Sequence, residues 1–169
     1  QEETITTEGY EYYNQLLFQN YVNSRYGLGA GWSFGFSSIQ IIHVGSDQYE
    51  YLHLSDGSVY TIKMTEDEDD SNLIEYKGTD VEIRLNQSYN STQYTSKYVL
   101  EYESGKKLYF SESGLLLATQ DRYGNEIQFE YTNDTFGTGH FYISKITDTI
   151  GRTLNFNYRV ETDKYLLDV

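Results

Sequence analysis

The sequence lacks two residue types altogether, because none of its 169 residues is cysteine or proline. Without cysteine the chain has no disulfide bonds, no thiolate nucleophile and no cysteine-ligated zinc. No apolar run approaches the length of a membrane span, and no signal-peptide pattern is present. The sequence therefore predicts no membrane insertion.

Basic residues are also scarce, since 12 Lys and Arg stand against 26 Asp and Glu and give a net charge of −14. Proteins that bind nucleic acid depend on basic side chains that neutralise phosphates, so we expect no nucleic-acid partner. The charge favours solubility instead, because like charge keeps strand-rich surfaces of separate copies from pairing.

Aromatic residues are abundant: they make up 17% of the chain and include 19 Tyr and 8 Phe. Tyrosine, together with Thr, Ile and Val, favours β-strands because these side chains pack well on a pleated, half-wet surface. Segments that favour helices are few. The composition therefore predicts an all-β protein.

A motif recurs at an offset of 27 residues between residues 114 and 158. Each copy has an aspartate, a glycine three residues later, and three large apolar residues at alternate positions. The residues that define the repeat are Asp121, Gly124, Ile127, Phe129 and Tyr131 in the first copy and Asp148, Gly151, Leu154, Phe156 and Tyr158 in the second. A fixed offset of this kind is the signature of a repeat architecture.

Each copy is typical of a β-hairpin. Asp-x-x-Gly suits a tight turn, because the aspartate bonds to nearby backbone and glycine tolerates a positive φ. The alternating apolar residues after the turn indicate a strand with one buried face. The same spacing follows Gly57 and Gly105, so we expect four hairpin units. Since a hairpin must stack on neighbours to bury its apolar face, we predict antiparallel hairpin repeats that form an open, twisted sheet or a partial β-shell.

These motifs resemble those of the Rhs/YD-repeat proteins, which are named for a tyrosine–aspartate motif. Two further segments, Tyr26-Gly-Leu-Gly-Ala-Gly-Trp32-Ser-Phe34 and Asp56-Gly-Ser-Val-Tyr60, resemble the region that precedes the first repeats in bacterial members. The resemblance implies a shell of stacked hairpins in a large secreted or surface protein, enclosing or presenting another domain. It implies no catalytic residues inside the repeats.

Three regions are expected to form one continuous structural domain. They are a lead-in at residues 1–22, a pre-repeat β region at 23–113 and the hairpin repeats at 114–169. Because the last repeat stops within its pattern, we expect the chain to be part of a longer array. Residues 10–21 fit either an early strand or a short helix, and the density of aromatics favours a strand.

Candidate reactive residues are few. The expected strands 38–44 and 48–54, joined by a turn at 45–47, could bring His43 and His53 face to face. With Asp47 they could imitate a metal or acid–base cluster, although ordinary cross-strand pairing is the more usual outcome.

An acidic run at residues 66–70 could bind Ca²⁺, which is held by oxygen ligands. It lacks the glycine and the closing glutamate of an EF-hand loop, so a solvated hairpin tip is the favoured interpretation. We expect no catalytic residue, no bound metal and no cofactor.

Two functions are compatible with these features. The first is a structural module whose partners are further repeats and other domains of the same parent chain. The alternative is a binding module in which Trp32, Tyr49 and Tyr51 form an aromatic platform for cell-wall carbohydrate or a surface protein. Burial of Trp32 in the core is the more usual fate of such a residue. We expect a secreted or cell-wall-associated bacterial protein and not an enzyme.

Overall fold

The computed structural model describes residues 35–64, 73–75, 81–85, 89–132, 141–161 and 164–167. Several expectations lie outside these residues. They are the lead-in with the element at 10–21, the glycine-rich segment with Trp32, the acidic run at 66–70 and His140.

Every regular element in the described residues is a strand, which confirms the all-β prediction. The strands are β1 (Ser38–Val44), β2 (Asp47–His53), β3 (Val59–Met64), β4 (Leu73–Glu75), β5 (Val81–Leu85), β6 (Ser96–Tyr102), β7 (Lys107–Ser111), β8 (Leu116–Gln120), β9 (Glu126–Thr132), β10 (Tyr142–Thr147), β11 (Thr153–Asn155), β12 (Tyr158–Glu161) and β13 (Lys164–Leu167).

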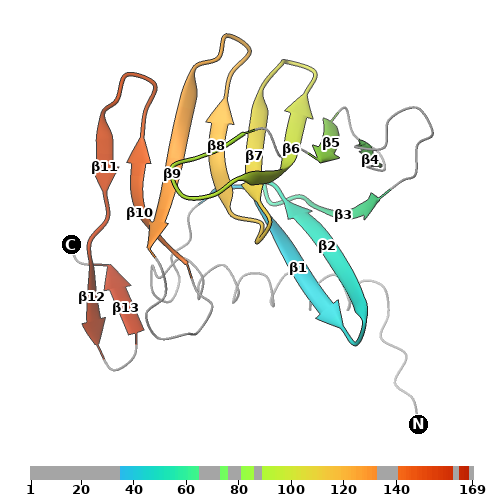
Figure 1. Ribbon diagram of the computed structural model, residues 1–169, viewed down its shortest axis with the longest axis horizontal. Coiled ribbons are helices and arrows are strands. Elements are labelled where there is room, and N and C mark those ends of the chain that lie inside the picture. The colour runs from blue at the N-terminus through green and yellow to red at the C-terminus, as the bar shows by residue number, and fades with distance from the viewer. Residues whose placement is uncertain are drawn as a thin grey trace. The chain divides into compact units, whose positions relative to one another are not determined.

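The strands pair in the order in which they occur along the chain (Figure 1). β1 to β11 form one open sequence of hydrogen-bonded neighbours that begins at β1 and ends at β11, and β12 pairs separately with β13. The pairing is antiparallel, as expected for successive hairpins, because short connections can join only antiparallel neighbours.

The chain divides into two compact units. The larger unit contains Gly35–Glu130 and Lys145–Leu154, and the described residues of 131–144 and 155–167 belong to the other. The region boundaries predicted after residues 22 and 113 rest on sequence pattern alone, and they stay predictions.

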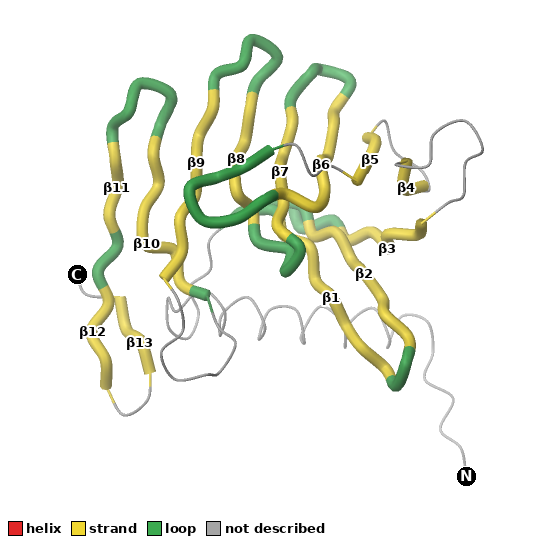
Figure 2. The backbone as a smooth tube through the Cα atoms, viewed as in Figure 1, coloured by secondary structure: helices red, strands yellow, loops and turns green. Residues whose placement is uncertain are grey.

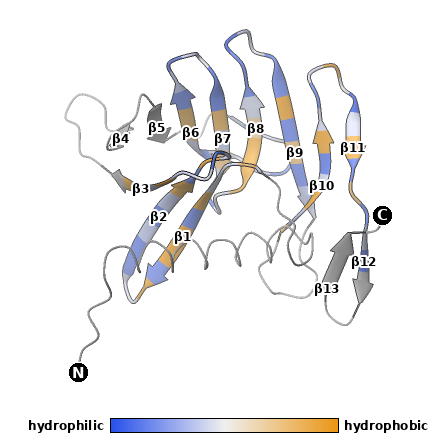
Figure 3. Ribbon diagram, turned by 180° about the vertical axis from the view of Figure 1, so that it is seen from behind, coloured by the Kyte–Doolittle hydropathy of each residue, from blue (hydrophilic) through white to orange (hydrophobic). Residues whose placement is uncertain are grey.

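The core of the larger unit lies on one face of β6 to β9. Tyr98 is paired with Phe110 and Leu100 with Leu108, and these side chains are buried. Ile39 and Leu52, from the paired strands β1 and β2, are fully buried as well. Phe36 packs edge-on against Phe129, with ring centroids 4.9 Å apart. Apolar segments, orange in Figure 3, accordingly run along β1, β7 and β8.

A loop covers part of the opposite face of the same strands. Residues 89–95 cross β7, β8 and β9 (Figure 2), and Tyr89 stacks on Tyr109 with ring centroids 4.2 Å apart. Together with Tyr94, Tyr89 packs against a buried cluster of Val99, Tyr109, Leu117 and Ala118. We call residues 89–95 the strap. It makes the centre of the sheet apolar on both faces.

The smaller unit contains the ends of the second repeat. The hydroxyl of Tyr158 donates to the carbonyl oxygen of Ile143 at 2.7 Å, and its ring lies 5.4 Å from that of Tyr142. The backbone N–H of Phe156 donates to the carbonyl oxygen of Ser144 at 2.9 Å. The strand that we expected to run without interruption through Tyr158 is divided into β11 and β12 at residues 156 and 157.

Candidate functional site

The hairpin turns are the feature that most clearly repeats in the structure. In each turn, the backbone N–H of the first residue donates to the carbonyl oxygen of the residue four positions later, at 2.9 Å. The N–H of the glycine, three positions after the first residue, donates to the carbonyl oxygen of that first residue at 2.8 to 3.1 Å. The glycine φ lies between 81° and 90°. This is a three-residue hairpin loop closed by a glycine bulge. In the described part of the chain it occurs at Leu54–Ser58, Tyr102–Lys106, Ser111–Leu115, Asp121–Asn125 and Asp148–Arg152.

Asp121 holds the first repeat turn with both of its carboxylate oxygens. Oδ1 accepts hydrogen bonds from the backbone N–H of Tyr123 at 2.8 Å and of Asn125 at 2.9 Å. Oδ2 accepts from the side-chain amide of Asn125 at 2.8 Å. These bonds, above all the one from the Asn125 side chain, lower the pKa of Asp121 because they favour the charged form.

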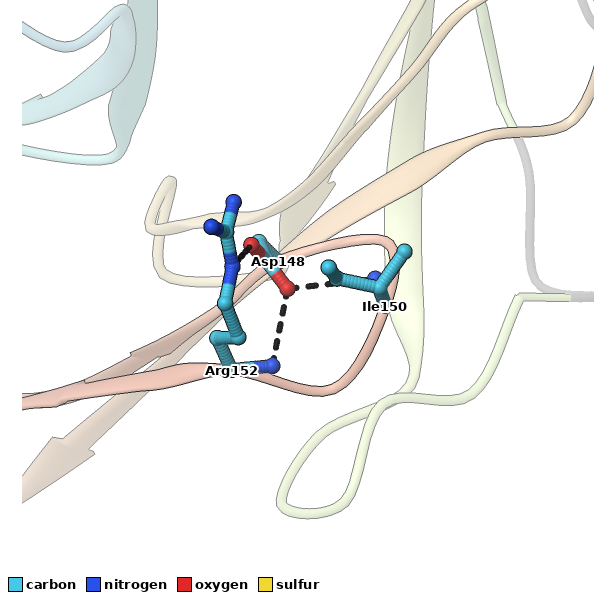
Figure 4. Close-up of polar contacts among 3 residues, drawn as sticks. All are labelled: Asp148, Ile150 and Arg152. Atoms are coloured by element: carbon cyan, nitrogen blue, oxygen red, sulfur yellow. Dashed lines mark hydrogen bonds and ion pairs between the residues drawn. The ribbon is translucent and has the colours of Figure 1, made fainter.

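Asp148 does the same in the second repeat turn (Figure 4). Its Oδ1 accepts from the backbone N–H of Ile150 at 3.1 Å and of Arg152 at 2.8 Å. Its Oδ2 accepts from Nε of Arg152 at 2.6 Å, and this side-chain bond is the main reason that the pKa of Asp148 is lowered. Both aspartates are therefore occupied within their own loops, so neither is placed to act as a general base.

Sequence reasoning missed the turn at Gly114. A serine, Ser111, stands where the repeat turns have aspartate, and its hydroxyl accepts from the N–H of Leu115 at 3.1 Å. The signal that could have found it is Ser-x-x-Gly, because serine makes the same kind of bond more weakly than aspartate. The carbonyl oxygen of Gly114 also accepts from the N–H of Ile39 at 3.0 Å, so this turn is attached to β1.

The apolar residues of the two repeats are not equally buried. In the first copy Phe129 and Tyr131 are buried, whereas Ile127 is 39% exposed. In the second copy Phe156 and Tyr158 are half-buried and Leu154 is 58% exposed. Leu154 was expected to lie on the buried face of its strand, but the structure leaves it exposed. The physical reason is that β11 is the last strand in the sheet order and has a neighbouring strand on one side only among the described residues.

The structure brings two of the three predicted platform residues together. Tyr49 and Tyr51 lie two residues apart on β2 and therefore share a face, where Tyr49 pairs with Ile42 and Tyr51 with Gln40. Tyr49 is 44% exposed and Tyr51 is half-buried. The third residue, Trp32, lies outside the described residues.

The histidines do not form a pair. His43 lies opposite Gln48 near the tip of the β1–β2 hairpin, whereas His53 lies opposite Ser38 at its base. Five residue steps along a strand separate them by about 17 Å, so the alternative of a cluster with Asp47 is wrong. The turn is also tighter than expected, because Asp47 already belongs to β2 and pairs with Val44.

His53 is buried and lies against Gln40, with Nε2 3.0 Å from Oε1. Burial penalises the charged imidazolium, which lowers the pKa of His53 from 6.5 to about 4. A buried, neutral histidine of this kind serves the packing of β1 on β2. Nothing in its position brings it close to the repeat turns.

Among the described residues, no three His, Asp or Glu side chains gather as a metal site would require. No described helix is long and apolar enough to cross a membrane. Comparison of the chain with known protein families, with curated proteins and with solved structures finds no match.

Proposed function

We propose that this chain is a structural module of a large secreted or cell-surface protein of the Rhs/YD-repeat type, where it forms part of a β-hairpin shell that encloses or presents another domain. The observation that carries this proposal is the equivalence of the Asp121 and Asp148 turns. The two loops lie 27 residues apart, and in each the aspartate carboxylate accepts from the same three donor positions: the backbone N–H two and four residues on, and the side chain four residues on.

The chemistry of these residues supports a scaffold better than an enzyme. The two repeat aspartates bond to their own loops, the glycines provide the left-handed backbone, and Phe129 and Tyr131 fill the core. All of these roles build a sheet. On this proposal the chain is not an enzyme, needs no cofactor, and has neighbouring repeats and domains of its parent as its partners.

The experiment that tests the scaffold role extends the repeat array. Two further Asp-x-x-Gly hairpins, copied from residues 115–158, are appended after Val169, and a scrambled extension of the same composition is the control. Since the stability of stacked repeats is roughly a sum of repeat and interface contributions, the matched extension should raise Tm and sharpen the unfolding transition. Equal melting curves for the two extensions would contradict the proposal.

A second function is favoured by one observation, the shared face of Tyr49 and Tyr51, of which Tyr49 is exposed and Tyr51 half-buried. Aromatic rings on a flat strand pair can stack on sugars or anchor a protein partner. The test is binding to glycan arrays and to isolated cell walls by the parent chain, Tyr49→Ala and Trp32→Ala. Loss of a binding signal in a variant whose circular dichroism is unchanged would favour a binding module over a scaffold.

A further inference from the structure

Among the described strands, β1 stands at one end of the sheet order, and it lacks the features that usually protect an edge strand. Edge strands are normally kept from pairing by lysine, proline, a bulge or short length. β1 (Ser-Ile-Gln-Ile-Ile-His-Val) has seven residues and no Lys, Pro, Gly or acidic residue. Its register with β2 runs from Ser38–His53 to Val44–Asp47 without a bulge. The other end of the sheet order differs, because β11 has only three residues.

The direction of the β1 backbone groups follows from one hydrogen bond. The N–H of Ile39 donates to Gly114 and not to β2, so Ile39 points its backbone groups toward the outer edge. Backbone groups alternate along an antiparallel strand, so Ile41 and His43 also point outward while Gln40 and Ile42 bond to β2. Among the described residues, none is hydrogen-bonded to the outward groups of Ile41 and His43.

We propose that this edge pairs with the same edge of a second copy of the chain, antiparallel and centred on Ile42. In this register Ile41 of each copy lies opposite His43 of the other. Each copy contributes the N–H and the carbonyl group of Ile41 and of His43, and these groups make four hydrogen bonds between the two copies. Gly114 keeps its bond to Ile39, whereas a register centred on Ile41 would have to displace it. Because the same patch is used on both copies, the assembly closes as a dimer.

The side chains on one face complement this pairing. Ile42 lies opposite its own counterpart in a non-hydrogen-bonded pair, where side chains approach most closely. Ile42 already pairs with Tyr49, so the dimer has an apolar row of Tyr49, Ile42, Ile42 and Tyr49 across four strands. Val44, which is 60% exposed, lies beside the row. The row is self-complementary, and this identifies the partner as a second copy.

The charge of the chain opposes the pairing of two copies in general, but β1 is a strand along which this opposition is weak. Each chain has a net charge of −14, so two copies repel over most of their surfaces. β1 contains no Asp, Glu, Lys or Arg, so two copies can approach along it without a pair of like-charged acidic or basic side chains on the two strands. The dimer should strengthen when salt is raised from about 0.05 to about 0.5 M, because screening weakens the repulsion between the remaining charges.

The absence of cysteine makes the register directly testable. A single Ile42→Cys places two thiols across the two-fold axis, with Cα atoms about 4.5 Å apart, which is within the range of a disulfide. Tyr49→Cys is the matched control, because three strand spacings of about 4.8 Å separate the two thiols in the dimer. We expect Ile42→Cys to form covalent dimers under mild oxidation and Tyr49→Cys to form none at the same concentration. Equal rates of cross-linking would overturn the proposal.

Two proline variants test the edge in the chain without cysteine. His43→Pro removes an outward N–H but no bond to β2, and the dimer should dissociate at least about tenfold more readily because two of four hydrogen bonds are lost. Thr153→Pro is the control, because it removes an outward N–H from β11, at the other end of the sheet order. The N–H of Phe156 points to β10, and backbone groups alternate along a strand, so the N–H of Thr153 points away from β10.

Sedimentation velocity over a range of protein and salt concentrations distinguishes the outcomes. Loss of the dimer in His43→Pro with Thr153→Pro unchanged supports the proposal. A parent chain that stays monomeric at high salt overturns it. Loss in both variants also overturns it, because this would mean that β1 of one copy pairs head to tail with β11 of another. The result does not depend on whether the chain is a scaffold.

Discussion

Glycines at equivalent turn positions have different roles in this protein. At Gly124 an added Cβ would meet no atom within 4 Å, so only the positive φ of 86° requires glycine. At Gly114 an added Cβ would lie 1.8 Å from the carbonyl oxygen of Ile39, in addition to the positive φ of 81°. Gly114 therefore permits the close approach of the β7–β8 turn to β1.

Gly114→Ala should destabilise the protein far more than Gly124→Ala. The positive φ alone costs a non-glycine residue about 1 kcal/mol, which we expect for Gly124→Ala. Gly114→Ala must also push the turn away from β1, with a total loss of about 3 kcal/mol or more. Urea denaturation of the two variants measures the difference. Equal losses would mean that the turn does not rest on β1.

His53 predicts a specific dependence of stability on pH. Its pKa is about 4 in the native state because it is buried, and 6.5 when the chain is unfolded. Below pH 6.5 the unfolded state binds a proton that the native state does not, so the free energy of unfolding falls as the pH drops from about 6.5 to about 4. The loss from this group is at most about 3 kcal/mol, and none of it is felt above pH 7.

Removal of the His53 imidazole tests this pH dependence. We expect the urea midpoint of the parent to fall between about pH 6.5 and about pH 4.5, whereas that of His53→Gln should show a flatter decline. If His53→Gln is too unstable to measure, the titration of His53 followed by NMR in the parent chain gives the answer. A native pKa near 6.5 would contradict the burial argument.

At the scale of elements, the hairpin is held by its loop more than by ion pairing. The carboxylate of Asp148 accepts two backbone N–H bonds, whereas its ion pair with Arg152 involves a side chain that is 78% exposed. Exposed ion pairs contribute little to stability because water and salt screen them. The backbone bonds to Asp148 therefore stabilise this loop more than its ion pair does.

Variants of Asp148 and Arg152 should lower Tm by amounts that follow from the hydrogen bonds that each variant removes. Asp148→Asn keeps an oxygen that can accept both backbone bonds and should lower Tm slightly, and Arg152→Ala should do the same. Asp148→Ala removes every acceptor and should give the largest decrease in Tm, by several degrees. Differential scanning calorimetry ranks the three variants. Equal decreases in Asp148→Asn and Asp148→Ala would show that the charge matters more than the loop geometry.

The strap is the element whose loss should expose the most apolar surface. Tyr89 stacks on Tyr109, and its hydroxyl donates to Glu126 at 2.7 Å. Tyr89→Phe removes only the hydroxyl, with its hydrogen bonds to Glu126 and Gln128, and should cost about 1 kcal/mol. Tyr89→Ala should cost about 3 kcal/mol because it uncovers the cluster beneath. Faster amide exchange at Tyr109 and Ala118 in Tyr89→Ala alone would locate the effect.

At the scale of the whole molecule, the sequence predicted the hairpins well but not their exceptions. Asp-x-x-Gly predicts a turn because aspartate accepts hydrogen bonds from the loop backbone and glycine adopts a positive φ, so the loops of Asp121 and Asp148 could be located. The turn after Ser111 lacks the aspartate. Leu117 is an extra residue in β8, since Tyr109 pairs with Ala118 and Phe110 with Leu116, and such a bulge breaks the alternation of faces.

Long-range contacts were the part that pattern could not supply. The approach of Gly114 to Ile39 joins residues that are far apart in the chain, and no local propensity encodes it. The same is true of the strap, whose Tyr89 meets Glu126 across 37 residues. The separation of His43 and His53, by contrast, follows from the hairpin register alone, because a turn of two or of three residues places His43 opposite Gln48 or Tyr49 and not opposite His53.

The strict pairing of each strand with its successor has a consequence for how the chain acquires its structure. When neighbours in space are neighbours in sequence, contact order is low, and each hairpin can close soon after it is synthesised. We therefore expect the sheet to form during synthesis on the ribosome, one hairpin after another from β1 onward. Joining of Ile39 to Gly114 would come later, because this hydrogen bond needs the β7–β8 turn to have been synthesised.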